Sequence, residues 1–114
     1  MATNGGISAI YSPLDIDQFT DSELAAAAFV TESFGSYFMV HAYYDNAVSR
    51  AIEFGARSIE HGHLMTEKVV RQMAREDVYL VVEALMSTSD APPSFTADQR
   101  EKFELAKSGF VEMI

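Results

Sequence analysis

A repeated alternation of helix-like and strand-like segments is the feature that most constrains the fold of this chain. Three helices are expected, each starting at a residue that favours a helix N-terminus: at Thr20, near Asp45 and at Thr66. The first start is the best defined, because Thr20 and Glu23 have the spacing of a capping box. The first two helices are expected to stop at Gly35 and Gly55, since glycine readily adopts the left-handed conformation that ends a helix.

Three short segments between and after these helices are rich in aromatic and β-branched residues. They are predicted as buried strands: Tyr37–His41, Arg57–His61 and Val78–Val82. Gly62 is expected to end the second strand. Strands joined by a single helix are parallel, because a parallel neighbour needs a crossover of a dozen or more residues. The sequence therefore predicts an α/β fold with three parallel strands and about four helices.

The chain of 114 residues is expected to form one α/β domain with three parts: a lead-in loop over 1–19, the alternating segment over 20–86 and a C-terminal helix over 95–114. Thr96 and Gln99 form a second capping box before that last helix. The helix has one apolar face, made by Phe103, Ala106, Phe110 and Ile114.

Composition argues against several classes of function. Seventeen acidic and eight basic residues give a net charge of −9, which is the wrong sign for binding phosphates, so nucleic acid is not an expected partner. No apolar stretch approaches the roughly 20 residues that cross a bilayer. The N-terminus lacks the pattern of a secretory signal, so a cytoplasmic location is expected. The absence of cysteine excludes disulfides and thiolate zinc sites.

The three histidines, His41, His61 and His63, lie at or just after the carboxyl ends of two adjacent predicted strands. Parallel α/β folds place their ligands at this edge. Neutral imidazoles from neighbouring strand ends can bind one metal ion, and Glu60 or Glu83 could add an oxygen ligand. The alternative is that the histidines are rim residues bonded to the backbone. The rings of His61 and His63 need not point together, because the strand is expected to end between them.

Seven short segments carry a resemblance to a known family: Gly5-Gly6-Ile7, Ser12–Asp15, Val40–Tyr43, Ala51–Gly55, Arg57–Gly62, Met73-Ala74 and Val78–Val81. Together they resemble the middle of the metal-dependent amidohydrolase superfamily, in particular its imidazolonepropionase-like and Xaa-Pro-dipeptidase-like members. The resemblance covers about residues 3 to 82. Its most specific part is the Arg57–Gly62 string, which follows a His-Ala-Tyr strand at the family's distance.

The resemblance implies a (β/α)8 barrel whose two metal ions lie at the carboxyl ends of the strands. Family members hold these ions with a His-x-His on strand 1, a carboxylated lysine on strand 4, one histidine each on strands 5 and 6, and an aspartate on strand 8. On that pattern His41 matches the strand 5 ligand and His61 the strand 6 ligand, whereas the other ligands are not matched. Val82-Glu83 stands where the family tends to have a Pro-Thr pair.

A full barrel takes about 250 residues, so this chain is expected to form only part of one. Strand alternation would place four residues on the face that lines a barrel interior: Met39, His41, Ile59 and His61. Phe38 and Val40 would then face the helices. An uncovered apolar face with open strand edges favours association. We therefore predict a homo-oligomer, unless the lead-in segment or the last helix covers that face.

The sequence thus favours a truncated amidohydrolase-like segment that does not catalyse as an isolated chain. His41 and His61 are the predicted metal ligands, but two histidines supply neither the dinuclear site nor the general base that amide hydrolysis requires. No bound cofactor is expected, and zinc is the metal that these two ligands would suit. Two alternatives stay open. One is a metal-dependent hydrolase of C–N or peptide amide bonds, and the other is a small metal- or ligand-binding module whose rim includes His63, Tyr43 and Glu83.

Overall fold

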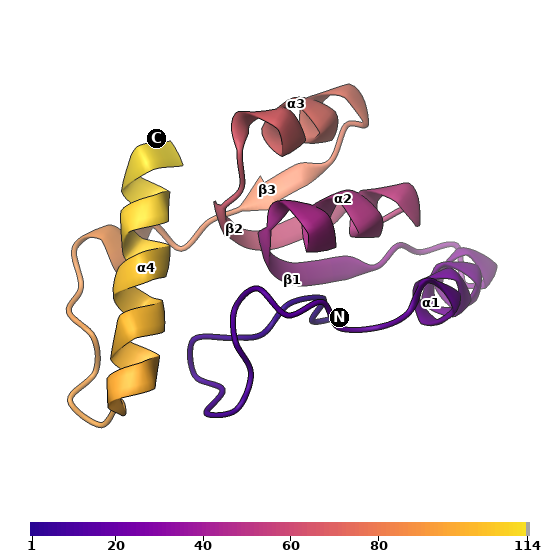
Figure 1. The fold of residues 1–114 in the computed structure, drawn as a ribbon. Coiled ribbons are helices and arrows are strands. Elements are labelled where there is room, and N and C mark those ends of the chain that lie inside the picture. The colour runs from indigo at the N-terminus through magenta and orange to yellow at the C-terminus, as the bar shows by residue number, and fades with distance from the viewer. Residues whose placement is uncertain (114) are drawn as a thin grey trace.

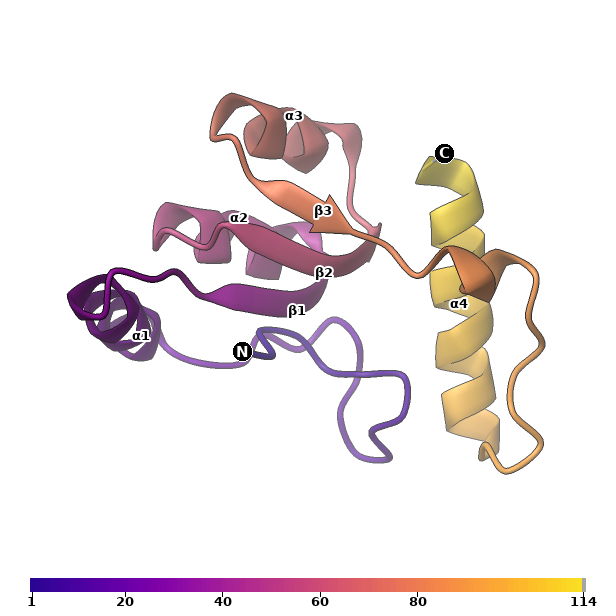
Figure 2. The same cartoon turned by 180° about the vertical axis from the view of Figure 1, so that it is seen from behind.

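The computed structural model describes residues 1–113 and has a three-stranded parallel sheet with helices α2 and α3 on one face (Figures 1 and 2). The elements in chain order are α1 (Asp21–Ser33), β1 (Met39–Tyr44), α2 (Asp45–Glu53), β2 (Ser58–Leu64), α3 (Glu67–Arg75), β3 (Tyr79–Val81), a short 3-10 helix η1 (Ala84–Ser87) and α4 (Ala97–Met113). The sheet order is β1-β2-β3, and both strand pairs are parallel. The predicted α/β fold with three parallel strands and about four helices is confirmed.

Helix α1 begins and ends where the local sequence signals place it. The Thr20 hydroxyl accepts a hydrogen bond from the N–H of Glu23, and the Glu23 carboxylate accepts one from the N–H of Thr20. Gly35 follows the helix with a φ of 63°, and Gly55 follows α2 with a φ of 89°. Both angles suit glycine, which has no Cβ to oppose them.

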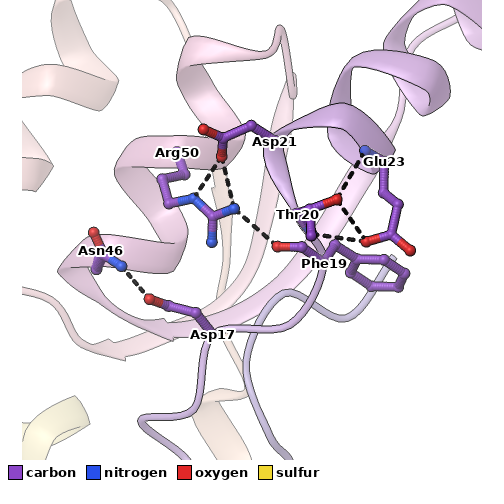
Figure 3. A network of polar contacts seen from close by, with 7 residues as sticks. All are labelled: Asp17, Phe19, Thr20, Asp21, Glu23, Asn46 and Arg50. Atoms are coloured by element: carbon purple, nitrogen blue, oxygen red, sulfur yellow. Dashed lines mark hydrogen bonds and ion pairs between the residues drawn. The ribbon is translucent and has the colours of Figure 1, made fainter.

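Arg50 of α2 joins that helix to the start of α1 (Figure 3). Its guanidinium donates to Oδ1 of Asp21 through Nε at 3.2 Å and through Nη2 at 2.8 Å. Nη2 also donates to the carbonyl oxygen of Phe19 at 2.8 Å. Close by, the amide of Asn46 donates to the carboxylate of Asp17. These contacts connect the segment before α1 to the helix that covers the sheet.

Two other helix starts use their polar residues differently. Thr66 is the residue before α3, but its hydroxyl donates to Oδ2 of Asp45 at 2.6 Å, and no side chain caps α3. In place of the expected cap, the Thr66 side chain forms a hydrogen bond to Asp45 at the start of α2. At α4 the second capping box forms as predicted, because Thr96 and Gln99 exchange hydrogen bonds between side chain and backbone. Ile114, the last residue of the predicted apolar face, lies outside the described residues.

The strands differ from their predicted bounds. Each begins one or two residues later than expected, and β1 ends at Tyr44 rather than His41 while β2 ends at Leu64 rather than His61. The prediction that Gly62 ends the second strand is wrong, because pairing resumes between Tyr44 and Leu64 after an irregularity in register. Such an irregularity absorbs extra residues without ending the strand.

The prediction that Ile59 lines the barrel-interior face is also wrong. Ile59 pairs with Val40, and both side chains are fully buried on the face covered by α2 and α3. The same core includes Ala42 of β1, so the helix-facing positions of β1 are the even-numbered ones. Directly paired residues of parallel strands point to the same face, and this register fixes Ile59 toward the helices.

The first residues of the lead-in segment pair with the outer edge of β1. The N–H of Thr3 donates to the carbonyl of His41, and the N–H of His41 donates to the carbonyl of Met1. Ala2 and His41 thereby form a parallel bridge. The side chain of Asn4 continues this edge by accepting from the N–H of Tyr43 at 2.9 Å.

Helix α4 lies across the carboxyl end of the sheet, where the chain after β3 leads into it (Figures 1 and 2). Lys102 of α4 donates to the carbonyls of Ala9 and Ser12, at 2.8 and 3.1 Å, and Gln99 donates to that of Ser8 at 2.7 Å. An apolar cluster fills the space between these segments: Ile7, Leu14, Tyr43, Met86, Phe103 and Ala106. The lead-in segment and α4 therefore form one unit beside the strand ends.

The face of the sheet opposite α2 and α3 stays partly uncovered. Met39 and Val81 are each 49% exposed, and Tyr79 is 71% exposed. The lead-in segment and α4 thus leave these three apolar side chains in contact with solvent. Within residues 1–113, no helix combines the length and the apolar character needed to cross a membrane.

Candidate metal and ligand site

Four rings from β1 and β2 meet at the carboxyl end of the sheet: His41, Tyr43, His61 and His63. The ring centroids of His41 and His61 are 4.6 Å apart, with 79° between the ring planes. Tyr43 stacks on His61 at 5.1 Å with 12° between the planes. The ring of His63 lies 6.0 Å from that of His61 and contacts Phe110 of α4 at 5.2 Å. The structure thus places the two predicted ligands side by side, while their binding of metal stays a prediction.

His61 reaches this cluster through an unusual backbone conformation. Its φ is 76°, and that of Gly62 is 63°, so two consecutive residues adopt the left-handed region. For a residue with a side chain this conformation costs about 1–2 kcal/mol, and strain of this kind concentrates at functional sites. A Cβ on Gly62 would lie 2.7 Å from Met65 Cε and 2.8 Å from Leu80 Cδ1. The break in alternation explains why His61 meets His41 although Ile59 faces the helices.

Each of the two predicted ligands has one ring nitrogen engaged by the protein. Nε2 of His41 is 2.8 Å from the carbonyl oxygen of Gly5, to which it donates when that nitrogen carries the proton. Nδ1 of His61 is buried and lies 3.1 Å from Oε2 of Glu83, although the two are not aligned as a hydrogen bond. Histidines that bind metal usually turn their second nitrogen to a carbonyl or carboxylate. These contacts involve Nε2 of His41 and Nδ1 of His61, so a metal ion bound by both rings would use Nδ1 of His41 and Nε2 of His61.

Burial disfavours the charged forms of His41, Tyr43 and His63. It lowers the pKa of His41 and outweighs the opposing effect of the Gly5 carbonyl. Burial also lowers the pKa of His63, with a further contribution from the neighbouring His61, and it raises the pKa of Tyr43 well above its ordinary value. Neutral imidazole is the form that coordinates metal. The environment therefore favours the state in which His41 can act as a ligand.

Of the two carboxylates expected near the histidines, Glu83 is the one that contacts a ring. Glu60 instead accepts a hydrogen bond from the Ser58 hydroxyl at 2.6 Å. Among residues 1–113, no three histidine, aspartate or glutamate side chains are arranged to hold one metal ion. The described donor set is therefore smaller than that of a complete metal centre, and an ion held by His41 and His61 would take its remaining ligands from water or from other chains.

A cavity of about 670 Å³ borders the ring pair. His41, Tyr43, His61 and Glu83 contribute to its wall, and apolar side chains from the lead-in segment, η1 and the α4 region complete it: Ile7, Met86, Phe95 and Phe103. Its size lies within the roughly 300–1,000 Å³ of small-molecule sites. Sequence reasoning did not assign these apolar residues to the site, because contacts between distant segments bring them to the histidines, among them those of Gln99 and Lys102 with the lead-in segment.

Several solved structures contain a part that is similar to this chain. A prolidase in complex with N-methylphosphonate-L-proline is 24% identical, with a TM-score of 0.87 over 98% of this chain and 28% of its own. An amidohydrolase is 25% identical, with a TM-score of 0.83 over 98% of this chain and 28% of its own. A Xaa-Pro dipeptidase with methionine in its active site is 24% identical, with a TM-score of 0.86 over 98% of this chain and 29% of its own.

The chain therefore spans less than a third of the length of these structures. This agrees with the resemblance found in the sequence, since the fold is that of a segment of amidohydrolase and dipeptidase structures. No family model matches the chain, and no curated protein sequence matches it.

Proposed function

We propose that this chain is a segment of an amidohydrolase-type barrel that contributes two ligands, His41 and His61, to a metal centre. The observation that carries the proposal is the pairing of the two rings on adjacent strands, with one nitrogen of each left for an ion. Zinc bound there would supply a Lewis acid and an activated water for attack on an amide bond. The Gly5 carbonyl and the Glu83 carboxylate lie beside the second nitrogens of the two rings and would orient them, and burial lowers the pKa of His41, which favours its neutral form.

We expect the isolated chain not to catalyse amide hydrolysis. Catalytic zinc sites use three protein ligands and a water, and the ring pair supplies two. Other barrel strands would supply the remaining ligands. This would explain why the described donor set is incomplete and why the chain matches 28–29% of the length of the solved structures.

Zinc titration by calorimetry tests the two-ligand assignment. We expect one zinc site per chain, lost in His41→Ala and in His61→Ala, and retained in His63→Phe, which keeps a ring against Phe110. We also expect the chain alone not to hydrolyse a Xaa-Pro dipeptide. Zinc binding that survives both alanine substitutions would contradict the assignment of ligands. Turnover by the isolated chain would contradict the non-catalytic role.

The proposal further includes association of two copies through the uncovered face of the sheet. Met39, Tyr79 and Val81 expose apolar surface there, and β3 pairs only with β2 in the described part of the chain. An exposed strand edge beside an apolar face is a template for pairing with another chain. A second copy would cover both features, so we expect a homodimer or a larger homo-oligomer.

A lysine substitution on this face distinguishes association through this face from nonspecific aggregation. Val81→Lys places a charge on the uncovered face, whereas Val111→Lys places one at a similarly exposed position of α4. Sedimentation equilibrium is expected to show an oligomer for the native chain and for Val111→Lys, and a monomer for Val81→Lys. A monomeric native chain would overturn this part of the proposal.

A second candidate function is the binding of a small ligand without turnover. The cavity beside the ring pair favours it, because apolar side chains of the lead-in segment and the α4 region form much of its wall. Small-molecule sites commonly combine such an apolar wall with a few polar groups. A hydrophobic dye that binds the native chain and is released by Phe103→Asp, with no hydrolysis in any oligomer, would support this candidate over the barrel segment.

A further inference from the structure

We infer that Glu83 is a positioning residue that selects the ring nitrogen of His61 offered to a metal ion. Its carboxylate lies beside Nδ1 and favours a proton on that nitrogen, so that Nε2 keeps the free lone pair. This inference rests on the proposed function, because it concerns one of the two proposed ligands.

The first observation is the surroundings of Nδ1. The atom is buried without an aligned hydrogen bond to any described residue, and Oε2 of Glu83 lies 3.1 Å away. A buried imidazole nitrogen without a partner is costly, so an acceptor at this distance favours a proton on Nδ1. The Glu83 side chain is 54% exposed, so solvent as well as His61 contacts its carboxylate.

The second observation is the way the ring is held. Tyr43, itself almost fully buried, stacks on His61 with 12° between the planes and fixes the plane of the imidazole. A fixed plane still permits two orientations, related by a half-turn about the Cβ–Cγ bond. The ring of His41, at 79° to that plane, does not distinguish them by stacking. A carboxylate on one side of the ring does, because it attracts the N–H and repels a lone pair.

The third observation is where Glu83 lies in the fold. It follows Val82, the first residue after β3, and directly precedes η1, so it stands at the same carboxyl edge of the sheet as the histidines of β1 and β2. Glu60 is also on this sheet, but its carboxylate is engaged by Ser58. These two glutamates therefore form a matched pair for experiment, with one in contact with the ring and one bonded elsewhere.

Nitrogen NMR of the metal-free chain tests the inference directly. At pH 8.5, the native chain is expected to carry the His61 proton on Nδ1, seen as a pyrrole-type Nδ1 signal and a pyridine-type Nε2 signal. Glu83→Leu is expected to move the proton toward Nε2, whereas Glu83→Gln is expected to keep it on Nδ1, because the amide oxygen still accepts. Glu60→Leu, the control, is expected to leave the His61 signals unchanged.

Zinc affinity gives a second readout. Loss of a partner of a metal-bound histidine typically weakens metal binding about 10–100-fold, and we expect that loss in Glu83→Leu and a smaller one in Glu83→Gln. An unchanged His61 tautomer in Glu83→Leu would overturn the inference even if zinc binds the native chain. Absence of zinc binding by a native chain that shows the expected tautomer would instead overturn the proposed function. The two failures are therefore distinguishable.

Discussion

The two faces of the central sheet differ in how completely the chain covers them. On the helix-facing side, Val40 and Ile59 are fully inaccessible to solvent beneath α2 and α3. On the opposite side, Met39, Tyr79 and Val81 keep about half or more of their surface exposed. The difference separates two roles. The helix-facing side holds the buried core of the fold, whereas the other side carries the ring of His41 and leaves apolar surface exposed.

The largest expected effect comes from the covered face. Ile59→Ala removes a fully buried side chain and should lower the free energy of unfolding by about 2–5 kcal/mol, whereas Ile59→Val should cost roughly 0.5–1.5 kcal/mol. Urea denaturation followed by circular dichroism measures both. A loss below that of Ile59→Val would mean that this side of the sheet is not the stabilising core.

The next effect lies where α4 approaches the end of β2. A Cβ on Gly109 would lie 2.1 Å from the carbonyl oxygen of His63 and 2.6 Å from Leu64 Cδ2. Gly109→Ala should therefore push α4 away and destabilise the chain by about 1–3 kcal/mol. The exposed neighbour Ser108→Ala serves as the control in thermal unfolding. Equal stability of the two variants would show that α4 is not held against β2 as described.

A smaller effect is expected from pH, through the histidines at the strand ends. The folded chain lowers the pKa of His41 and His63 below the ordinary value of about 6.5. The unfolded chain then binds more protons as the pH falls below that value. The stability that these groups contribute is therefore complete above about pH 6.5, and it is lost as the pH falls toward their lowered pKa values.

Urea midpoints measured from pH 8 down to pH 5.5 test this dependence. His63→Phe should flatten it, because the phenyl ring keeps the contact with Phe110 and does not titrate. A chain that gains stability on acidification in this window would contradict the assigned direction of the pKa shifts.

The smallest effect should come from the uncovered face. Met39→Ser changes a half-exposed side chain on β1 and should alter the stability of the monomeric chain by no more than about 0.5 kcal/mol. The same urea titration, at a concentration where the chain is monomeric, provides the value. A loss as large as that of Ile59→Ala would remove the distinction between the two faces.

Much of the fold could be predicted from short-range patterns. The capping pairs Thr20–Glu23 and Thr96–Gln99 form as expected, because each involves residues three positions apart whose bonds do not depend on the rest of the chain. The alternation of helices and strands likewise predicted the parallel sheet. The proximity of His41 and His61 followed from the same reasoning, since carboxyl ends of adjacent parallel strands lie at one edge.

The pattern of apolar and polar residues could not predict the exact register of the strands or which side chains that register brings together. A two-residue period predicts which residues share a face only while the backbone stays extended, and the left-handed conformation of His61 breaks that period. For this reason strict alternation predicts the barrel-interior face for Ile59, which in fact faces the helices. His61 still reaches His41. The contact of Glu83 with His61 depends on where the chain turns after β3, and no local signal specifies that turn.

The sequence by itself determined the kinds of elements, their order and the two adjacent strands that carry the histidines, because these follow from interactions between residues close along the chain. Only the tertiary structure decided the pairing of the lead-in segment with β1, the placement of α4 across the strand ends and the cavity that results. These features depend on contacts such as that of Lys102 with Ala9, between residues far apart in the chain. Such contacts form only once the whole chain has folded.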